Sequence, residues 1–144
     1  MSELHDLADV VDDHTGLARV VLEYTTEMKR TVDRAKEPGF DTSGWDGIAA
    51  LLDVDAFVRV GPFKDRMDWP AYVAFLTAWA SGSYWECSFR RITEHGNLVI
   101  LELEERMAPG DHEGAANSAS VFEFDDDGRL RRLDVYLQLP AGGA

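Results

Sequence analysis

Apolar and polar side chains alternate along the C-terminal part of the chain in a pattern typical of β-strands. The alternation runs through four segments, residues 84–92, 98–107, 118–124 and 130–139. Successive side chains of a strand point to opposite faces, so each segment predicts a strand with one apolar and one polar face. Gly96 and Gly128 lie in the short polar connections, where a hairpin turn needs a residue that tolerates positive φ. The pattern therefore predicts an antiparallel meander.

Helical spacing of apolar residues comes before the meander. From Thr15, a candidate N-cap, apolar residues recur every three or four positions until the break at Pro38, which predicts a long first helix. A short second helix is expected over residues 45–52. A third is expected over residues 68–81, where Asp68 is a favourable N-cap and the apolar face is rich in aromatic side chains.

Helices followed by a meander predict an α+β fold with a mainly antiparallel sheet. Residues 56–63 predict one further short strand before the third helix. We expect a single domain over residues 15–140, preceded by an acidic arm at 1–14 and followed by a tail at 141–144. A chain of 144 residues is long enough to bury a core without disulfide support.

Charge and cysteine content narrow the classes of partner. The chain has 14 basic and 27 acidic residues and a net charge of −13, which disfavours binding to nucleic acids or to anionic membranes. Cys87 is the only cysteine, so no internal disulfide forms. No apolar run is long enough to span a membrane, and the N-terminal segment lacks the features of a secretory signal. We therefore expect a cytoplasmic protein.

No local sequence motif identifies a reaction. The chain contains no phosphate-binding glycine loop, no HExxH motif, no nucleophile elbow and no calcium loop. The histidines lie in the arm, in a turn or in a loop, so we expect no metal site and no cofactor. One of them lies between two acidic residues, where it can cover a pocket mouth. The four are His5, His14, His95 and His112.

Acidic residues within the strands are the more informative candidates. A carboxylate walled by apolar groups has a raised pKa and can act as a general acid or base. Alternation favours a different role, a solvated or inter-subunit face with cross-strand ion pairs, because most of these carboxylates lie opposite the apolar face. The carboxylates are Glu86, Glu102, Glu104, Glu105 and Asp134, and their candidate partners are Arg106, Arg131 and Arg132.

Three stretches within residues 15–140 carry a resemblance to a known family. They are WDGIAALLDVDAFVRVGPF, DWPAYVAFLTAWASG and the meander that ends in GRLRRLDVYLQ. With the first helix, they resemble the nuclear transport factor 2-like superfamily, in its SnoaL-like branch. The resemblance implies a cone in which a strongly bent sheet wraps around N-terminal helices and leaves one pocket. It also implies a homodimer through the outer sheet face.

The superfamily includes ketosteroid isomerases, dehydratases, polyketide cyclases, epoxide hydrolases and noncatalytic binders, and its catalytic residues are largely missing here. The dipeptide Val60-Gly61 stands where the isomerases have an Asp base, and Tyr84-Trp85 where the dehydratases have a His. Of the epoxide hydrolase residues only Arg106 is kept. Asp134 lies one residue out of register from Val135, the position that matches the second Asp of those enzymes.

The candidate site residues follow from this resemblance and from the predicted faces. Tyr24 is the first candidate, because a tyrosine on the first helix can donate a hydrogen bond to a carbonyl oxygen. Ordinary packing with the hydroxyl at the rim is its alternative. The catalytic candidates are Tyr24, Asp134 and Arg106. The expected pocket residues are Tyr24, Met28, Val60, Tyr72, Trp79, Trp85, Asn117 and Val135.

Three functions remain open at this point. The first is the binding of a small apolar or polycyclic molecule in the pocket, without metal or cofactor. The second is a cofactor-independent isomerase, dehydratase or cyclase that uses a carboxylate as acid or base and a tyrosine as oxyanion donor. The third is a noncatalytic dimeric scaffold whose pocket is filled by its own side chains.

Overall fold

The computed structural model describes residues 4–108 and 115–140. His112 and the expected tail lie outside the described residues. The helices are α1 (Leu7–Val10), η1 (Val11–Asp13), α2 (Gly16–Arg34), η2 (Thr42–Trp45), α3 (Asp46–Ala49) and α4 (Trp69–Ala80). The strands are β1 (Val58–Val60), β2 (Arg66–Asp68), β3 (Tyr84–His95), β4 (Leu98–Ala108), β5 (Ala116–Phe124) and β6 (Leu130–Gln138).

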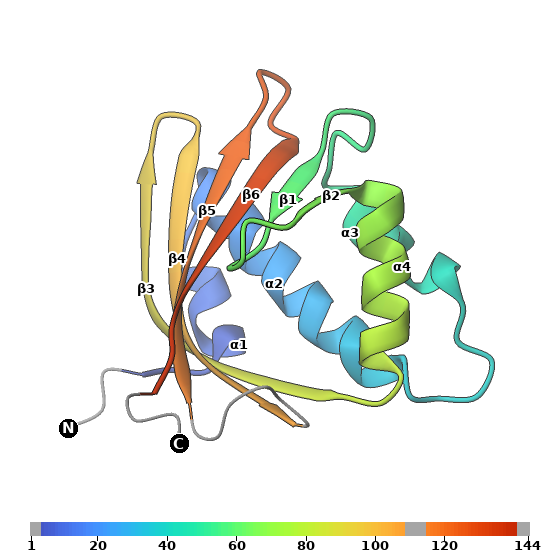
Figure 1. The fold of residues 1–144 in the computed structure, drawn as a ribbon. Coiled ribbons are helices and arrows are strands. Elements are labelled where there is room, and N and C mark those ends of the chain that lie inside the picture. Colours follow the sequence, from blue (N-terminus) through green and yellow to red (C-terminus); the bar gives the residue numbers. More distant parts are fainter. Residues whose placement is uncertain (1–3, 109–114, 141–144) are drawn as a thin grey trace.

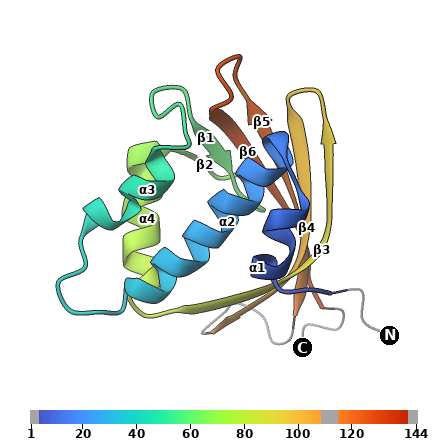
Figure 2. The same cartoon turned by 180° about the vertical axis from the view of Figure 1, so that it is seen from behind.

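The strands form one mixed sheet that the helices cover on a single side (Figures 1 and 2). The strand order is β2-β1-β6-β5-β4-β3, and every pair is antiparallel except β1 with β6. The expected α+β fold with a mainly antiparallel sheet is confirmed. Strand β2, which pairs with β1, was not expected, because three residues are too few to show an alternation.

Helix α2 lies diagonally across the sheet and is anchored by a strand at its first turn (Figure 2). Thr15 occupies the N-cap position, as expected, but its side chain makes no capping hydrogen bond. The backbone N–H of Ala18 instead donates to Glu94 Oε1 at 2.9 Å. A carboxylate is favourable near a helix N-terminus, so Glu94 at the end of β3 ties the helix to the sheet.

Helix α4 begins as its sequence predicts. Asp68 Oδ1 accepts a hydrogen bond from the backbone N–H of Ala71 at 3.0 Å, and a proline occupies the first turn. The fully buried Trp45, at the end of η2, donates from Nε1 to Thr77 Oγ1 in α4 at 3.0 Å. Helix α4 is therefore held at a fixed position beside α2, with its aromatic face toward the sheet.

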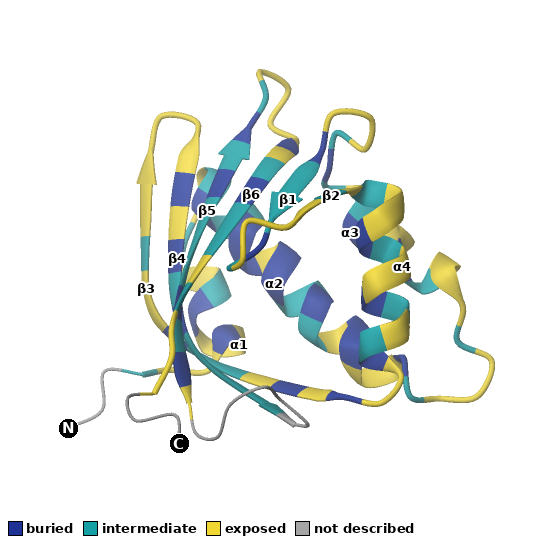
Figure 3. Ribbon diagram, viewed as in Figure 1, coloured by how far each residue is buried: buried dark blue, intermediate teal, exposed yellow. Residues whose placement is uncertain are grey.

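The sheet has two faces, which we call inner (toward α2 and α4) and outer. Strand pairing places Val99, Phe122, Leu133 and Arg59 in one row across β4, β5, β6 and β1. The first three are buried, which identifies this row as the inner face. Buried residues occur along α2 and along the strands of the sheet (Figure 3). No helix of the described residues is long and apolar enough to cross a membrane.

Candidate ligand-binding site

A cavity of about 430 Å³ lies between the inner face of the sheet and helices α2 and α4. Its volume falls within the usual range for small-molecule sites. Phe63 and Phe75 lie at its border, and their side chains are exposed. Most of the wall is apolar, and this part consists of Met28, Leu76, Trp79, Leu101, Leu103, Met107, Phe122, Leu133, Val135 and Leu137.

The structure brings most of the expected pocket residues together in this cavity. Two helices and two strands contribute them, because α2, α4, β3 and β6 all turn a face toward the same space. The six that line the cavity are Tyr24, Met28, Tyr72, Trp79, Trp85 and Val135.

Val60 and Asn117 lie on the outer face, contrary to the expectation that they line the pocket, whereas Asp134 lies there as the strand alternation favoured. Val60 is the register partner of Asp134, one position away from the inner row that holds Arg59. Asp134 is bound by Arg132, whose Nε lies 2.8 Å from its Oδ2. Asn117 is the register partner of Gln138, and both side chains therefore lie on the outer face. A shift of one residue reverses the face of a side chain, which explains these differences.

Arg106 also points away from the cavity. Its guanidinium donates to Glu104 at 2.7 Å and to Ser88 Oγ at 3.0 Å, both of which share the outer face. The predicted cross-strand ion pairs are present there as well, as in Arg91 with Glu102, where Nη2 lies 2.8 Å from Oε1. The hydrogen bond from Arg91 lowers the pKa of the Glu102 carboxyl.

Tyr24 places a buried hydroxyl at the cavity wall. Its side chain is only 5% exposed, and its ring meets that of Phe122 edge to face at 5.6 Å. The hydroxyl makes no hydrogen bond of ordinary length within the described residues, although the Tyr72 side chain lies close enough for a weak hydrogen-bonding interaction with it. Burial, and then Tyr72, raise the pKa of Tyr24 well above its usual value, so the group remains a donor.

Arg59 is a cavity residue that the sequence pattern did not single out. Its guanidinium carbon lies 5.0 Å from the centre of the Tyr72 ring, and its Nη1 lies 3.7 Å from Asp65 Oδ2. Both Arg59 and Asp65 line the cavity. Strand β1 has only three residues, so its inward side was decided by its pairing with β6 and not by a visible alternation.

Glu105 supplies a second carboxylate to the cavity, and the sequence did contain a signal for it. It shares the parity of Val99, Leu101 and Leu103 along β4, and so it faces inward. Trp85 Nε1 donates to Glu105 Oε1 at 2.8 Å. Of the strand carboxylates considered above, Glu105 is the one among the described residues that lines the cavity.

Two other kinds of reactive site were considered for the cavity, a cysteine nucleophile and a cluster of metal-binding side chains. Burial, and then the neighbouring Glu105, raise the pKa of the Cys87 thiol to about 12, so it is protonated near neutral pH. Within residues 4–108 and 115–140, no three His, Cys, Asp or Glu side chains are grouped as metal ligands. The polar side-chain groups that line the cavity are hydroxyl, guanidinium, carboxylate and indole N–H groups.

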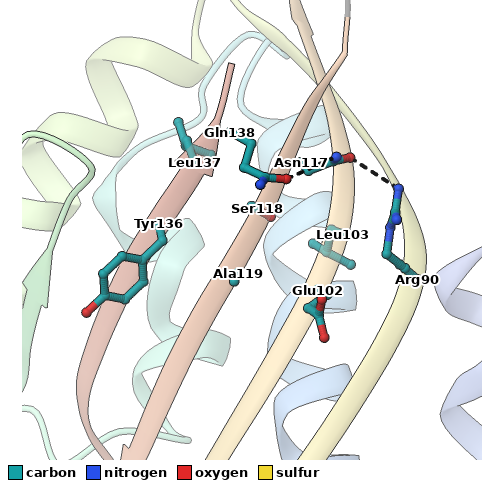
Figure 4. Close-up of a pocket in the computed structure, with 9 residues that line it drawn as sticks. All are labelled: Arg90, Glu102, Leu103, Asn117, Ser118, Ala119, Tyr136, Leu137 and Gln138. Atoms are coloured by element: carbon teal, nitrogen blue, oxygen red, sulfur yellow. Dashed lines mark hydrogen bonds between the residues drawn. The ribbon is translucent and has the colours of Figure 1, made fainter. Parts of the chain in front are cut away.

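A groove crosses the outer face of the sheet (Figure 4). Asn117 lies at its centre and is linked to Arg90 on one side and to Gln138 on the other, at 3.4 Å each. Tyr136, which is 60% exposed, lies beside them. The groove joins β3, β4, β5 and β6 and has polar and apolar parts, in contrast to the mainly apolar cavity on the inner face.

Solved structures share this fold, although no protein-family model and no curated protein matches the sequence. An NTF2-like protein of unknown function from Cytophaga hutchinsonii has a TM-score of 0.58 and 15% identity over 87% of this chain and 92% of its own. A steroid delta-isomerase from Pseudomonas aeruginosa has a TM-score of 0.61 and 21% identity, with coverages of 90% and 84%.

A protein of the SnoaL-like family from Agrobacterium tumefaciens has a TM-score of 0.54 and 15% identity, with coverages of 81% of this chain and 98% of its own. At these identities the similarity shows a common fold. The resemblance to NTF2-like and SnoaL-like proteins is thereby confirmed at the level of the fold.

Burial of Tyr24 predicts a pH dependence of stability. Below about pH 10 the phenol is protonated in both the folded and the unfolded chain, so it adds no pH dependence. Above that pH the unfolded chain releases the proton while the folded chain keeps it, because burial raises the folded pKa. The free energy of unfolding should then fall, by up to about 1.4 kcal/mol per pH unit from this group.

Urea unfolding between pH 8 and 11 measures the effect. Tyr24→Phe should lose stability less steeply above pH 10 than the native protein. Tyr84→Phe changes a tyrosine that is 62% exposed and keeps Tyr24, so it should show the steeper fall. Equal slopes for Tyr24→Phe and the native protein would contradict the prediction.

Proposed function

Because the chain has the nuclear transport factor 2-like fold, we propose that it binds a small, largely apolar molecule in the cavity. The observation that carries the proposal is the Tyr24 hydroxyl, buried in an apolar wall without a hydrogen-bond partner among the described residues. An unpaired buried donor costs free energy, and a ligand oxygen that accepts from it removes this cost. The ligand is therefore an apolar or ring-containing molecule with at least one acceptor oxygen.

A thermal-shift screen tests ligand binding. Ketones with fused rings, including steroid, anthraquinone and terpenoid ketones, should raise the melting temperature, because a ligand that binds only the folded state stabilises it. For a ligand found in this way, Tyr24→Phe should weaken binding about 3- to 10-fold, since one hydrogen bond is lost.

Two controls accompany this screen. Tyr84→Phe removes an exposed hydroxyl outside the cavity and should leave the affinity unchanged. The hydrocarbon of the same ring system, which lacks the oxygen, should bind the native protein and Tyr24→Phe equally. Failure of every compound to shift the melting temperature would argue for the scaffold and against a ligand-binding cavity.

A cofactor-independent isomerase or lyase is the second candidate function. The observation that favours it is the Glu105 carboxylate, which lines the same cavity as Tyr24 and is oriented by Trp85. In such an enzyme Glu105 removes a proton next to a carbonyl group of the bound molecule. A steroid delta-isomerase has a similar fold, which supports this candidate function.

Proton exchange tests the enzyme function separately from binding. If the second candidate is correct, the native protein should accelerate exchange of the α-protons of a bound ketone in D₂O, as followed by NMR. Glu105→Gln should lower the rate at least about 100-fold, because the general base is lost. Glu104→Gln changes the next residue, on the outer face, and is the matched control. Binding of the ketone without accelerated exchange would contradict the enzymatic function and would leave the proposed ligand-binding function standing.

We also propose a homodimer through the outer sheet face. Tyr136, Ile100 and Leu98 are exposed on that face, beside the groove of Arg90 and Asn117. A patch of exposed apolar side chains with a polar surround is typical of protein interfaces. The polar residues of the groove then contact the partner and not solvent.

Sedimentation velocity measures the mass of the particle. The native protein should sediment at about twice the chain mass of 16.1 kDa. Ile100→Glu places a charge in the proposed interface and should yield monomers. Phe63→Glu places the same charge at the border of the cavity, on the other side of the sheet, and should leave the dimer intact. A native monomer at all concentrations would contradict the dimer.

A further inference from the structure

Arg59 is a cation on the inner face of the sheet with incomplete hydrogen bonding. Its side chain is 15% exposed, and its Nε is buried without a hydrogen-bond partner among the described residues. Its guanidinium lies over the Tyr72 ring. A guanidinium removed from water needs an anion in direct hydrogen-bonded contact to offset the loss of solvation. The cation is therefore placed to receive such an anion.

Asp65 supplies only a loose counterion. The shortest contact between the two groups is 3.7 Å, from Nη1 to Oδ2, whereas a charge-assisted hydrogen bond spans about 2.7–2.9 Å. Asp65 belongs to the turn between β1 and β2 and is 41% exposed, so it has water as an alternative. Within the described part of the chain, no other carboxylate lies within ion-pair distance of Arg59.

Tyr24 presents a second donor at the same end of the cavity, and within the described residues its buried hydroxyl makes no hydrogen bond of ordinary length. Its ring packs on Phe122, which lies in the inner row with Leu133 and Arg59, and the Arg59 charge acts on its pKa. A neutral carbonyl oxygen satisfies the hydroxyl but leaves the guanidinium with only its loose contact to Asp65. A carboxylate has two oxygens and one negative charge, so it satisfies both groups.

Glu105 lies too far away to serve as this anion. It is on β4, three strands from β1, which corresponds to roughly 14 Å across the sheet. It is also six residues along β4 from Val99, the member of the Arg59 row. The cavity therefore has a cationic end at Arg59 and an anionic end at Glu105, with apolar side chains such as Leu101 and Leu103 between them.

We propose that the ligand is an apolar carboxylic acid whose carboxylate binds Arg59 and Tyr24 in the place that Asp65 takes without ligand. The inference rests on the proposed binding function and specifies the class of ligand. The apolar body of the acid lies along the wall formed by β4, β5 and β6. When the ligand carboxylate replaces Asp65, the turn from Gly61 to Asp65, which carries Phe63, loses its contact with Arg59.

Matched acids and amides test this proposal. The probes are 2-naphthoic acid and 1-naphthylacetic acid, each with its primary amide, titrated by calorimetry at pH 7.5, where the acids are ionised. The native protein should bind each acid at least about tenfold more tightly than the amide. Arg59→Gln should weaken the acid about 10- to 100-fold and change the amide less than about twofold. Asp65→Asn should strengthen the acid about tenfold, because its competitor is removed.

The two variants act in opposite directions, so a general loss of structure does not imitate the result. The melting temperature of each variant without ligand shows that it is folded. Equal affinity for acid and amide in the native protein, unchanged in both variants, would overturn the carboxylate proposal and leave the binding function standing. Absence of binding by all four probes, together with a negative ketone screen, would overturn both.

Discussion

The hydrogen-bond register of the sheet is the constraint on which the site depends. Strand pairing places Arg59, Leu133, Phe122 and Val99 in one inward row, and alternation sends the neighbouring positions to the outer face. A shift of one residue in the parallel pairing of β1 with β6 would replace Arg59 by Val58 or Val60 on the inner face. The charge of the cavity therefore depends on three paired residues of a very short strand.

The attachment of the helices to the strands creates the cavity in front of this row. Glu94 binds the first turn of α2, and Asp68 begins α4 next to β2, so both helices are attached to strands at defined points. The tie between Trp45 and Thr77 also holds α4. Space between the helices and the sheet is thus left open, and it is lined by the aromatic and aliphatic faces that would otherwise pack together. Buried polar groups that lack partners in such a space are typical of sites that await a ligand.

The two faces of the sheet separate two kinds of polar chemistry. On the outer face, carboxylates and guanidinium groups pair with one another at hydrogen-bond distance, as in Arg132 with Asp134. In the cavity, the Tyr24 hydroxyl and the Arg59 Nε are buried without a hydrogen-bond partner among the described residues, and Glu105 accepts from Trp85. The paired groups are typical of a stable surface or subunit contact, whereas the unpaired ones are typical of recognition.

The sequence by itself determined the elements of this protein, because their periods of 3.6 and 2 are local properties of the chain. It placed α2 and α4, the four long strands and the Asp68 cap, and the parity of β4 was enough to bring Glu105 inward. Only the tertiary structure decided that Arg59 faces the cavity while Val60 and Asn117 do not. Strand β1 is too short to show its alternation, and its inner side follows from long-range pairing with β6, which no local pattern encodes.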